Sequence, residues 1–205
     1  MSRSNGKYRT FLIFGAPGSG KGTQGKVIGG LPGFVHVACG EVFRALDPQS
    51  ELGQVFLQYS SRGQLVPDDL TVQLWHEHIQ KMIRAEQFRP QEDYLVLDGI
   101  PRNVTQAEIL DQYIAVQRLL YLECRDSEAL VARLKRRALH ENRLDDAHEE
   151  VIRARLKAFE EETAPVIAYY PPERVVRLNG IQPPLQVLHD VVTAMAEVLY
   201  PAADS

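Results

Sequence analysis

The sequence predicts an α/β fold in which a five-stranded parallel sheet is flanked by helices. A glycine-rich turn, residues 15–24, follows the apolar run 10–14. Four further strand-like runs cover residues 34–38, 94–98, 118–123 and 174–178, and helical patterns separate most of them. Strands that alternate with helices are typical of a parallel sheet that is covered on both faces.

Four helical segments can be placed from their apolar spacing. They cover residues 69–85, 127–137, 152–170 and 184–199, and the third carries a proline, Pro165, at which we expect a disturbance. We find no repeat, low-complexity segment or linker, so residues 1–205 should form one domain.

Composition narrows the classes of protein that the chain could represent. It has 205 residues, 44% hydrophobic and 24% charged, with a net charge of −4, two cysteines and no apolar run near the ~20 residues of a membrane span. Residues 1–7 lack the apolar stretch of a secretory signal. We therefore expect a cytoplasmic protein that binds neither membrane nor nucleic acid.

The turn after the first strand has the features of a phosphate-binding loop. Glycines at 15, 18, 20 and 22 allow the backbone to curl around an anion, with the N–H groups of the following helix behind it. Lys21 adds a positive charge for the β- and γ-phosphates of a triphosphate. The predicted contacts are Gly18, Ser19, Gly20, Lys21, Gly22 and Thr23.

A second motif, Asp98-Gly99-Ile100-Pro101-Arg102, ends the run 94–98. Because ligands of a parallel sheet bind beyond the carboxyl ends of its strands, Asp98 should lie beside the phosphate loop. A carboxylate there can hold Mg²⁺ through water, since Mg²⁺ keeps several waters. Gly99 and Pro101 should force a turn that directs Arg102 across the cleft.

Over residues 11–191 the sequence resembles adenylate kinases of the short-lid type. The resemblance rests on these two motifs, on Gln106, on the run 62–68 and on a series of arginines from 133 to 155. The resemblance implies a nucleoside monophosphate kinase domain with a monophosphate-binding insertion at 39–67 and a short lid at 138–143. It implies reversible, Mg²⁺-dependent transfer from ATP to AMP, giving two ADP, by a monomer whose partners are small nucleotides.

The same resemblance assigns roles to individual residues. The catalytic set is Lys21, Arg102, Arg137, Arg143 and Arg155. The ATP side includes Arg133, Arg137 and Gln182. The AMP side includes Cys39, Arg44, Val66, Gly99, Arg102 and Gln106. Zinc is not expected in the lid, because residues 138–143 contain no cysteine, and no metal ligated directly by side chains is expected.

One element departs from the family pattern and leaves the monophosphate open. Ala38-Cys39-Gly40-Glu41 stands where the family usually has Ser-Thr-Gly-Asp. Gln106 favours adenine, because a carboxamide can both donate to and accept from the adenine edge. The alternatives are a UMP/CMP kinase and a nucleotide-binding sensor without turnover.

Overall fold

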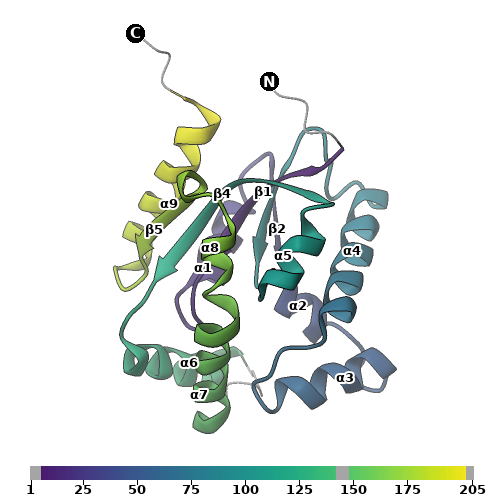
Figure 1. Cartoon of the computed structure of the whole chain (residues 1–205), viewed down its shortest axis with the longest axis vertical. Coiled ribbons are helices and arrows are strands. Elements are labelled where there is room, and N and C mark those ends of the chain that lie inside the picture. Colours follow the sequence, from purple (N-terminus) through teal and green to yellow (C-terminus); the bar gives the residue numbers. More distant parts are fainter. Residues whose placement is uncertain (1–5, 142–147, 202–205) are drawn as a thin grey trace.

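A computed structural model describes residues 6–141 and 148–201 of the chain. Its centre is a sheet of five parallel strands in the order β2-β3-β1-β4-β5 (Figure 1). The strands are β1 (Tyr8–Phe14), β2 (Phe34–Ala38), β3 (Tyr94–Asp98), β4 (Ile114–Glu123) and β5 (Val175–Asn179). The predicted α/β fold with a five-stranded parallel sheet is confirmed.

Helices occupy the connections between the strands, and one more follows the last strand. They are α1 (Lys21–Ile28), α2 (Cys39–Arg44), α3 (Glu51–Ser60), α4 (Asp68–Arg84), α5 (Val104–Leu110), α6 (Ser127–Glu141), α7 (Glu149–Ala158), α8 (Val166–Tyr169) and α9 (Pro184–Leu199). A π-helical turn (Phe159–Thr163) separates α7 from α8, and a short 3₁₀ turn (Pro172–Arg174) precedes β5. Within the described residues no helix is both long and apolar enough to cross a membrane.

Two of the predicted helices differ from the sequence expectation. Helix α6 continues past 137 to Glu141, so residues 138–141 of the predicted lid are helical; Ala138 and Leu139 are strong helix formers. Asn142 and Arg143, the rest of that lid, lie outside the described residues. The disturbance expected at Pro165 begins already at Phe159, whose carbonyl accepts a hydrogen bond from the Ala164 N–H at 2.8 Å.

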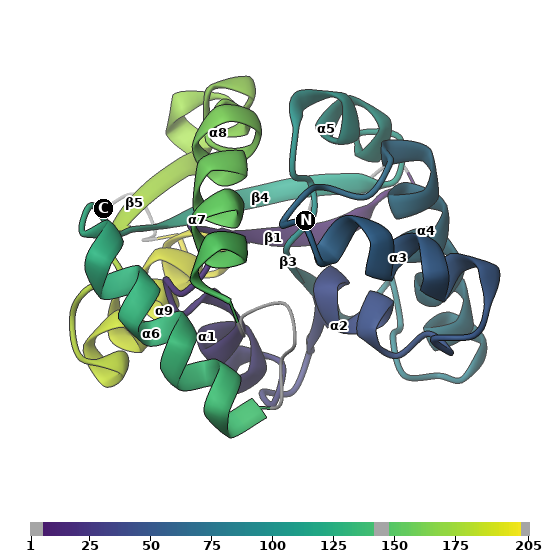
Figure 2. The same cartoon turned by 90° about the horizontal axis from the view of Figure 1, so that it is seen from below.

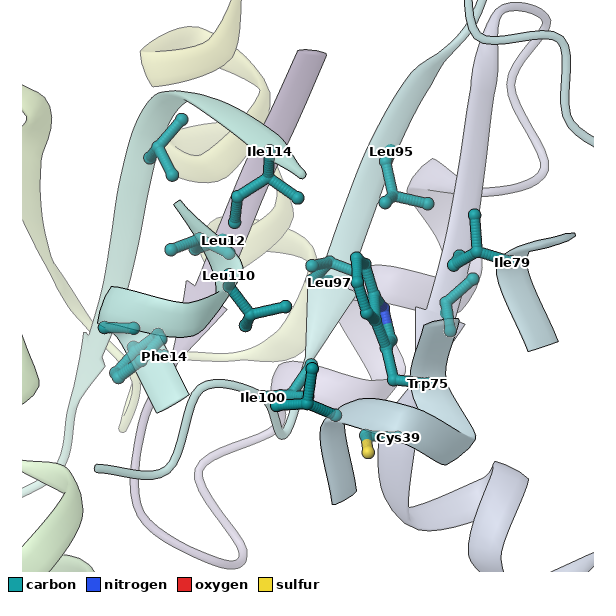
Figure 3. Packing of buried hydrophobic residues seen from close by; sticks show 14 of the residues in the cluster. Leu12, Phe14, Cys39, Trp75, Ile79, Leu95, Leu97, Ile100, Leu110 and Ile114 are labelled. Atoms are coloured by element: carbon teal, nitrogen blue, oxygen red, sulfur yellow. The ribbon is translucent and has the colours of Figure 1, made fainter. Parts of the chain in front are cut away.

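The alternation of side chains along the strands builds a core on each face of the sheet. In β1, Phe11 and Ile13 pack with α1 and α9, whereas Leu12 and Phe14 pack with α4, α5 and α8. Figure 3 shows the second of these clusters, in which Trp75 of α4 is fully buried. Burial of each such side chain stabilises the fold by roughly 1.5–3 kcal/mol, which fixes the sheet as a rigid base.

All strands run in one direction, so their carboxyl ends meet at a single edge. Helices α2 and α3 flank this edge on one side and α6 and α7 on the other (Figure 2). β1 ends at Phe14 before the glycine-rich turn, β2 ends at Ala38 before α2, and β3 ends at Asp98. The glycine-rich turn, the element 38–41 and the motif 98–102 therefore all begin at this edge.

Candidate active site

The loop between β1 and α1 is curled by glycines with positive φ. Gly18 and Gly20 have φ values of 85° and 97°, which residues with a Cβ atom rarely adopt. A Cβ atom on Gly18 would lie 3.1 Å from the Leu130 carbonyl oxygen, so the loop packs closely on α6. Gly20 is the N-cap of α1 and has no side chain to occupy the N–H groups of the first turn. These N–H groups can therefore bind an anion.

Lys21 opens α1 and lies at the centre of the site. Its Nζ donates to the Ala16 carbonyl oxygen at 3.3 Å. Burial lowers the pKa of Lys21 to about 8, Asp98 opposes this shift, and the positive charges of Arg102, Arg137 and Arg155 add to it. A cation that is held among other cations at a desolvated position is suited to bind a negatively charged ligand.

The turn after β3 carries a carboxylate, Asp98, and a guanidinium, Arg102. The side chain of Asp98 is buried, and a Cβ atom on Gly22 would lie 3.3 Å from its Oδ2. Gly99 has a φ of 80°, and the Ile100–Pro101 peptide bond is cis. Arg102 folds back over this turn and donates from Nε to the Gly99 carbonyl oxygen at 2.9 Å. The predicted proximity of Asp98 to the phosphate loop is therefore seen in the structure.

Two cavities open along this edge of the sheet. The arm cavity lies against α2, α3 and the turn before α4; among its lining residues are Cys39, Phe43, Arg44, Phe56, Gly63, Val66, Thr71, Gly99, Arg102, Gln106, Arg155 and Phe159. The loop cavity lies over the glycine-rich turn; among its lining residues are Gly18, Gly20, Lys21, Gly22, Thr23, Asp98, Arg102, Arg133, Arg137 and Arg155. Both cavities share Pro17, Lys21, Gly40, Arg44, Gly99, Arg102 and Arg155.

This shared wall carries four cationic side chains, Lys21, Arg44, Arg102 and Arg155, although the chain as a whole has a net charge of −4. Guanidinium groups stay charged and can bind two phosphate oxygens at once. Ligands in the two cavities would therefore meet at Lys21 and Arg102, with their phosphates towards each other. Such an arrangement suits transfer of a phosphoryl group from one ligand to the other.

Cys39 and Gln106 line the arm cavity in different ways. Cys39 is 2% exposed, belongs to the core cluster and lies below Trp75 in Figure 3. Burial raises the pKa of its thiol to about 11. Gln106 is also buried, but both ends of its carboxamide are hydrogen-bonded, to the Arg102 N–H and to Asp68. The thiol therefore acts as an apolar surface, whereas the carboxamide has a fixed orientation.

Two of the predicted residues, Ser19 and Gln182, line neither cavity. Ser19 is buried beneath the loop, and its hydroxyl finds no hydrogen-bond partner among the described residues. Gln182 donates to Asp190 Oδ2 at 2.7 Å and to the Asn179 carbonyl oxygen at 3.2 Å, so its carboxamide is engaged at the start of α9. Arg143 lies outside the described residues.

Arg133 is the residue that joins α6 to the loop before α9. Its guanidinium donates to the carbonyl oxygens of Gly180 and Ile181 at 3.1 and 3.3 Å. Arg137 lies one turn further along α6 and also lines the loop cavity. The spacing of four residues puts both arginines on the same side of the helix.

The sequence analysis missed several residues that shape the arm cavity. Phe43 and Phe56 stack with their ring centroids 5.3 Å apart and their planes at 16°. Gly63 lies so close to α7 that a Cβ atom on it would be 2.9 Å from the Val151 carbonyl oxygen. Phe43 adjoins Arg44 and could have been noticed, but no local pattern marks Phe56 as its partner.

Comparison with known proteins identifies relatives along most of the chain. A family model described as adenylate kinase matches residues 13–175. The adenylate kinase of Flavobacterium psychrophilum is 32% identical over 195 residues, 92% of this chain and 96% of that protein. The adenylate kinase of Thermobifida fusca is 34% identical over 190 residues (90% and 96%), and that of a Cyanothece species is 38% identical over 179 residues (84% and 87%).

Proposed function

The chain belongs to the adenylate kinase family, and we propose that the wall shared by its two cavities carries the reaction of that family. The reaction is the reversible transfer of the γ-phosphoryl group of ATP to AMP, which gives two ADP. We assign ATP to the loop cavity and AMP to the arm cavity. This assignment is supported by the phosphate loop in the first and by Gln106 in the second.

Lys21, Arg102 and Arg155 are the residues that we place on the transferring group. All three line both cavities, so they can contact phosphates from either nucleotide. Charge spreads over the phosphoryl oxygens in the transition state, and fixed cations stabilise it there. No side chain need act as a nucleophile, because the phosphate oxygen of AMP is already anionic.

The remaining predicted residues hold the nucleotides. On the ATP side, Arg133 and Arg137 extend from α6 over the loop cavity. On the AMP side, Arg44 donates from Nη1 to the Gly40 carbonyl oxygen at 2.9 Å, which points its guanidinium into the shared wall. The role of Arg143 in binding the phosphates stays a prediction. Gln182 would have to break its hydrogen bond to Asp190 to contact a nucleotide.

Asp98 fits the Mg²⁺ that the family implies. Its carboxylate is buried at the end of β3 beside Gly22 of the phosphate loop, and it lines the loop cavity. Carboxylate oxygens and waters are the ligands that Mg²⁺ prefers. When bound, Mg²⁺ would offset the negative charge of the ATP phosphates. The negative charge of Asp98 also raises the pKa of Lys21, so more of the lysine stays protonated at neutral pH.

The test is a side-by-side comparison of acceptors with ATP and Mg²⁺. We expect kcat/KM for AMP to exceed that for UMP and CMP by roughly ten- to a hundredfold, the worth of a base-reading hydrogen-bond pair. Equal or higher values for UMP or CMP would instead make the enzyme a pyrimidine monophosphate kinase. Binding of both nucleotides without any ADP would make it a sensor.

We further propose that the protein works as a monomer in the cytoplasm. Cys39 and Cys124 are free thiols, which suits a reducing compartment. Light scattering of the purified chain, with and without nucleotides, would measure its mass against the 23.1 kDa of one copy.

A further inference from the structure

The carboxamide of Gln106 is held at both of its ends by groups of opposite kind. Its Oε1 accepts from the backbone N–H of Arg102 at 2.8 Å. Its Nε2 donates to Oδ1 of Asp68, the first residue of α4, at 2.7 Å. The side chain is 1% exposed, so water does not compete for either bond.

These two neighbours determine which end of the carboxamide is oxygen and which is nitrogen. A backbone N–H can only donate, and an ionised carboxylate can only accept. A carboxamide rotated by 180° would place its NH₂ against the Arg102 N–H and its oxygen against the Asp68 carboxylate. Both hydrogen bonds would be lost at a buried position, where an unpaired polar group is costly.

Asn103 holds Asp68 in place for this task. Its Nδ2 donates to the same Oδ1 of Asp68 at 2.8 Å, and its own Oδ1 accepts from the Gln106 backbone N–H at 2.8 Å as the N-cap of α5. The three side chains thus form one connected network between α4 and α5. None of its bonds depends on a ligand.

The fixed carboxamide still has binding capacity left. It carries two N–H hydrogens and two oxygen lone pairs, and the network uses one of each. The remaining donor and acceptor belong to a side chain that lines the arm cavity beside Cys39 and Phe43. A 6-amino purine offers a donor at N6 next to an acceptor at N1, and a 6-oxo purine offers an acceptor at O6 next to a donor at N1. One fixed order of donor and acceptor can match only one of them.

We propose that Asp68 is a specificity-determining positioning residue: it fixes the carboxamide of Gln106 so that the monophosphate cleft selects a 6-amino purine over a 6-oxo purine. Asp68 acts through Gln106 and does not line the arm cavity itself. The inference rests on the proposed assignment of AMP to this cavity. It gives Asp68 a role that the family resemblance did not assign.

The experiment compares AMP with IMP, which differ only at position 6 and N1 of the purine. The variants are Asp68→Ala, which removes the accepting oxygen, and Asp68→Asn, which keeps an oxygen there but removes the charge. Asp69→Ala is the matched control, because Asp69 is exposed and lies in the same first turn of α4. For each protein, kcat and KM are measured with ATP, and the dissociation constants of AMP and IMP are measured by calorimetry.

In Asp68→Ala we expect the ratio of kcat/KM for AMP to that for IMP to fall about tenfold, the effect of losing one of the two orienting bonds. The change should appear in KM and in the dissociation constants, with kcat for AMP nearly kept. Asp68→Asn and Asp69→Ala should retain the wild-type ratio. If Asp68→Ala does not fold, Asp68→Ser, whose hydroxyl can donate as well as accept, takes its place.

An unchanged ratio in Asp68→Ala, or an equal loss for AMP and IMP, would overturn the proposal and leave Asp68 a merely structural residue. A ratio that falls equally in Asp69→Ala would assign the effect to the charge at the start of α4. Failure of the proposed function looks different, because the wild-type protein itself would then not phosphorylate AMP.

Discussion

Replacement of Lys21 by methionine should lower kcat strongly and at the same time stabilise the nucleotide-free protein. Lys21 is charged at neutral pH in a desolvated position among Arg102, Arg137 and Arg155. Without phosphates nearby, this charge opposes folding. Methionine has a similar length and no charge, so the variant avoids the free-energy cost of the desolvated charge. It also lacks the ammonium group that we place on the transferring phosphoryl group.

The size of the effect follows from the pKa of Lys21, which is about 8 in the folded protein against 10.5 as its ordinary value. One pKa unit corresponds to about 1.4 kcal/mol, and the cleft admits some solvent, so we expect a gain of about 2–3 kcal/mol at pH 7. For a chain of this size the melting temperature should rise by roughly 5–10 °C. In parallel, kcat should fall on the order of 10²-fold or more.

The gain should also depend on pH in a defined direction. Between pH 8 and pH 10.5 the folded protein releases the Lys21 proton while the unfolded chain retains it, so the wild type becomes more stable as the pH rises. The methionine variant lacks this titration. All other groups titrate in both proteins, so their contributions cancel in the difference between the two unfolding free energies. The advantage of the variant should therefore be largest below pH 8 and should shrink towards pH 10.

Urea denaturation of both proteins at pH 7 and at pH 10 measures this difference. Lys26→Met is the control, because Lys26 lies on the same helix but is 60% exposed and pairs with Glu41. A surface pair of this kind contributes only ~0–1 kcal/mol. A Lys21→Met protein that is less stable than the wild type at pH 7, or whose advantage is the same at both pH values, would refute the reasoning.

Three further outcomes can be measured on single variants or on the wild type. Gly63→Ala should raise KM for AMP about tenfold more than Gly33→Ala does. Both glycines have a positive φ, but a Cβ atom on Gly63 would clash with α7, whereas no described atom lies within 4 Å of a Cβ atom on Gly33. The Cys39 thiol, buried and with a pKa of about 11, should resist alkylation at pH 7 more than Cys124 does, which mass spectrometry can follow; rapid native labelling of Cys39 would contradict its burial. Arg155→Ala should lower kcat on the order of 10²-fold with little change in melting temperature, and a normal kcat would remove Arg155 from the transferring group.

The sequence predicts the strands and the edge at which we place the nucleotides, because these features are local. β2, β3 and α9 have the predicted bounds, and the phosphate loop and Asp98 follow directly from their strands. Residues 114–117 at the start of β4 were not predicted, because Gln117 interrupts the apolar run. In the fold, Arg118 donates to the Glu173 carbonyl oxygen, a contact that no local pattern indicates.

The sequence by itself determined the fold class, the phosphate loop and the supply of arginines, since these depend on spacings within a few residues. Only the tertiary structure decided how distant segments meet. Gly63 lies on α7, Phe56 stacks on Phe43, and Asp68 holds Gln106 from 38 residues away. Such contacts depend on how α3, α4 and α7 pack at the edge of the sheet. The periodicity of a segment predicts which of its faces is buried, but it does not predict which other segment covers that face.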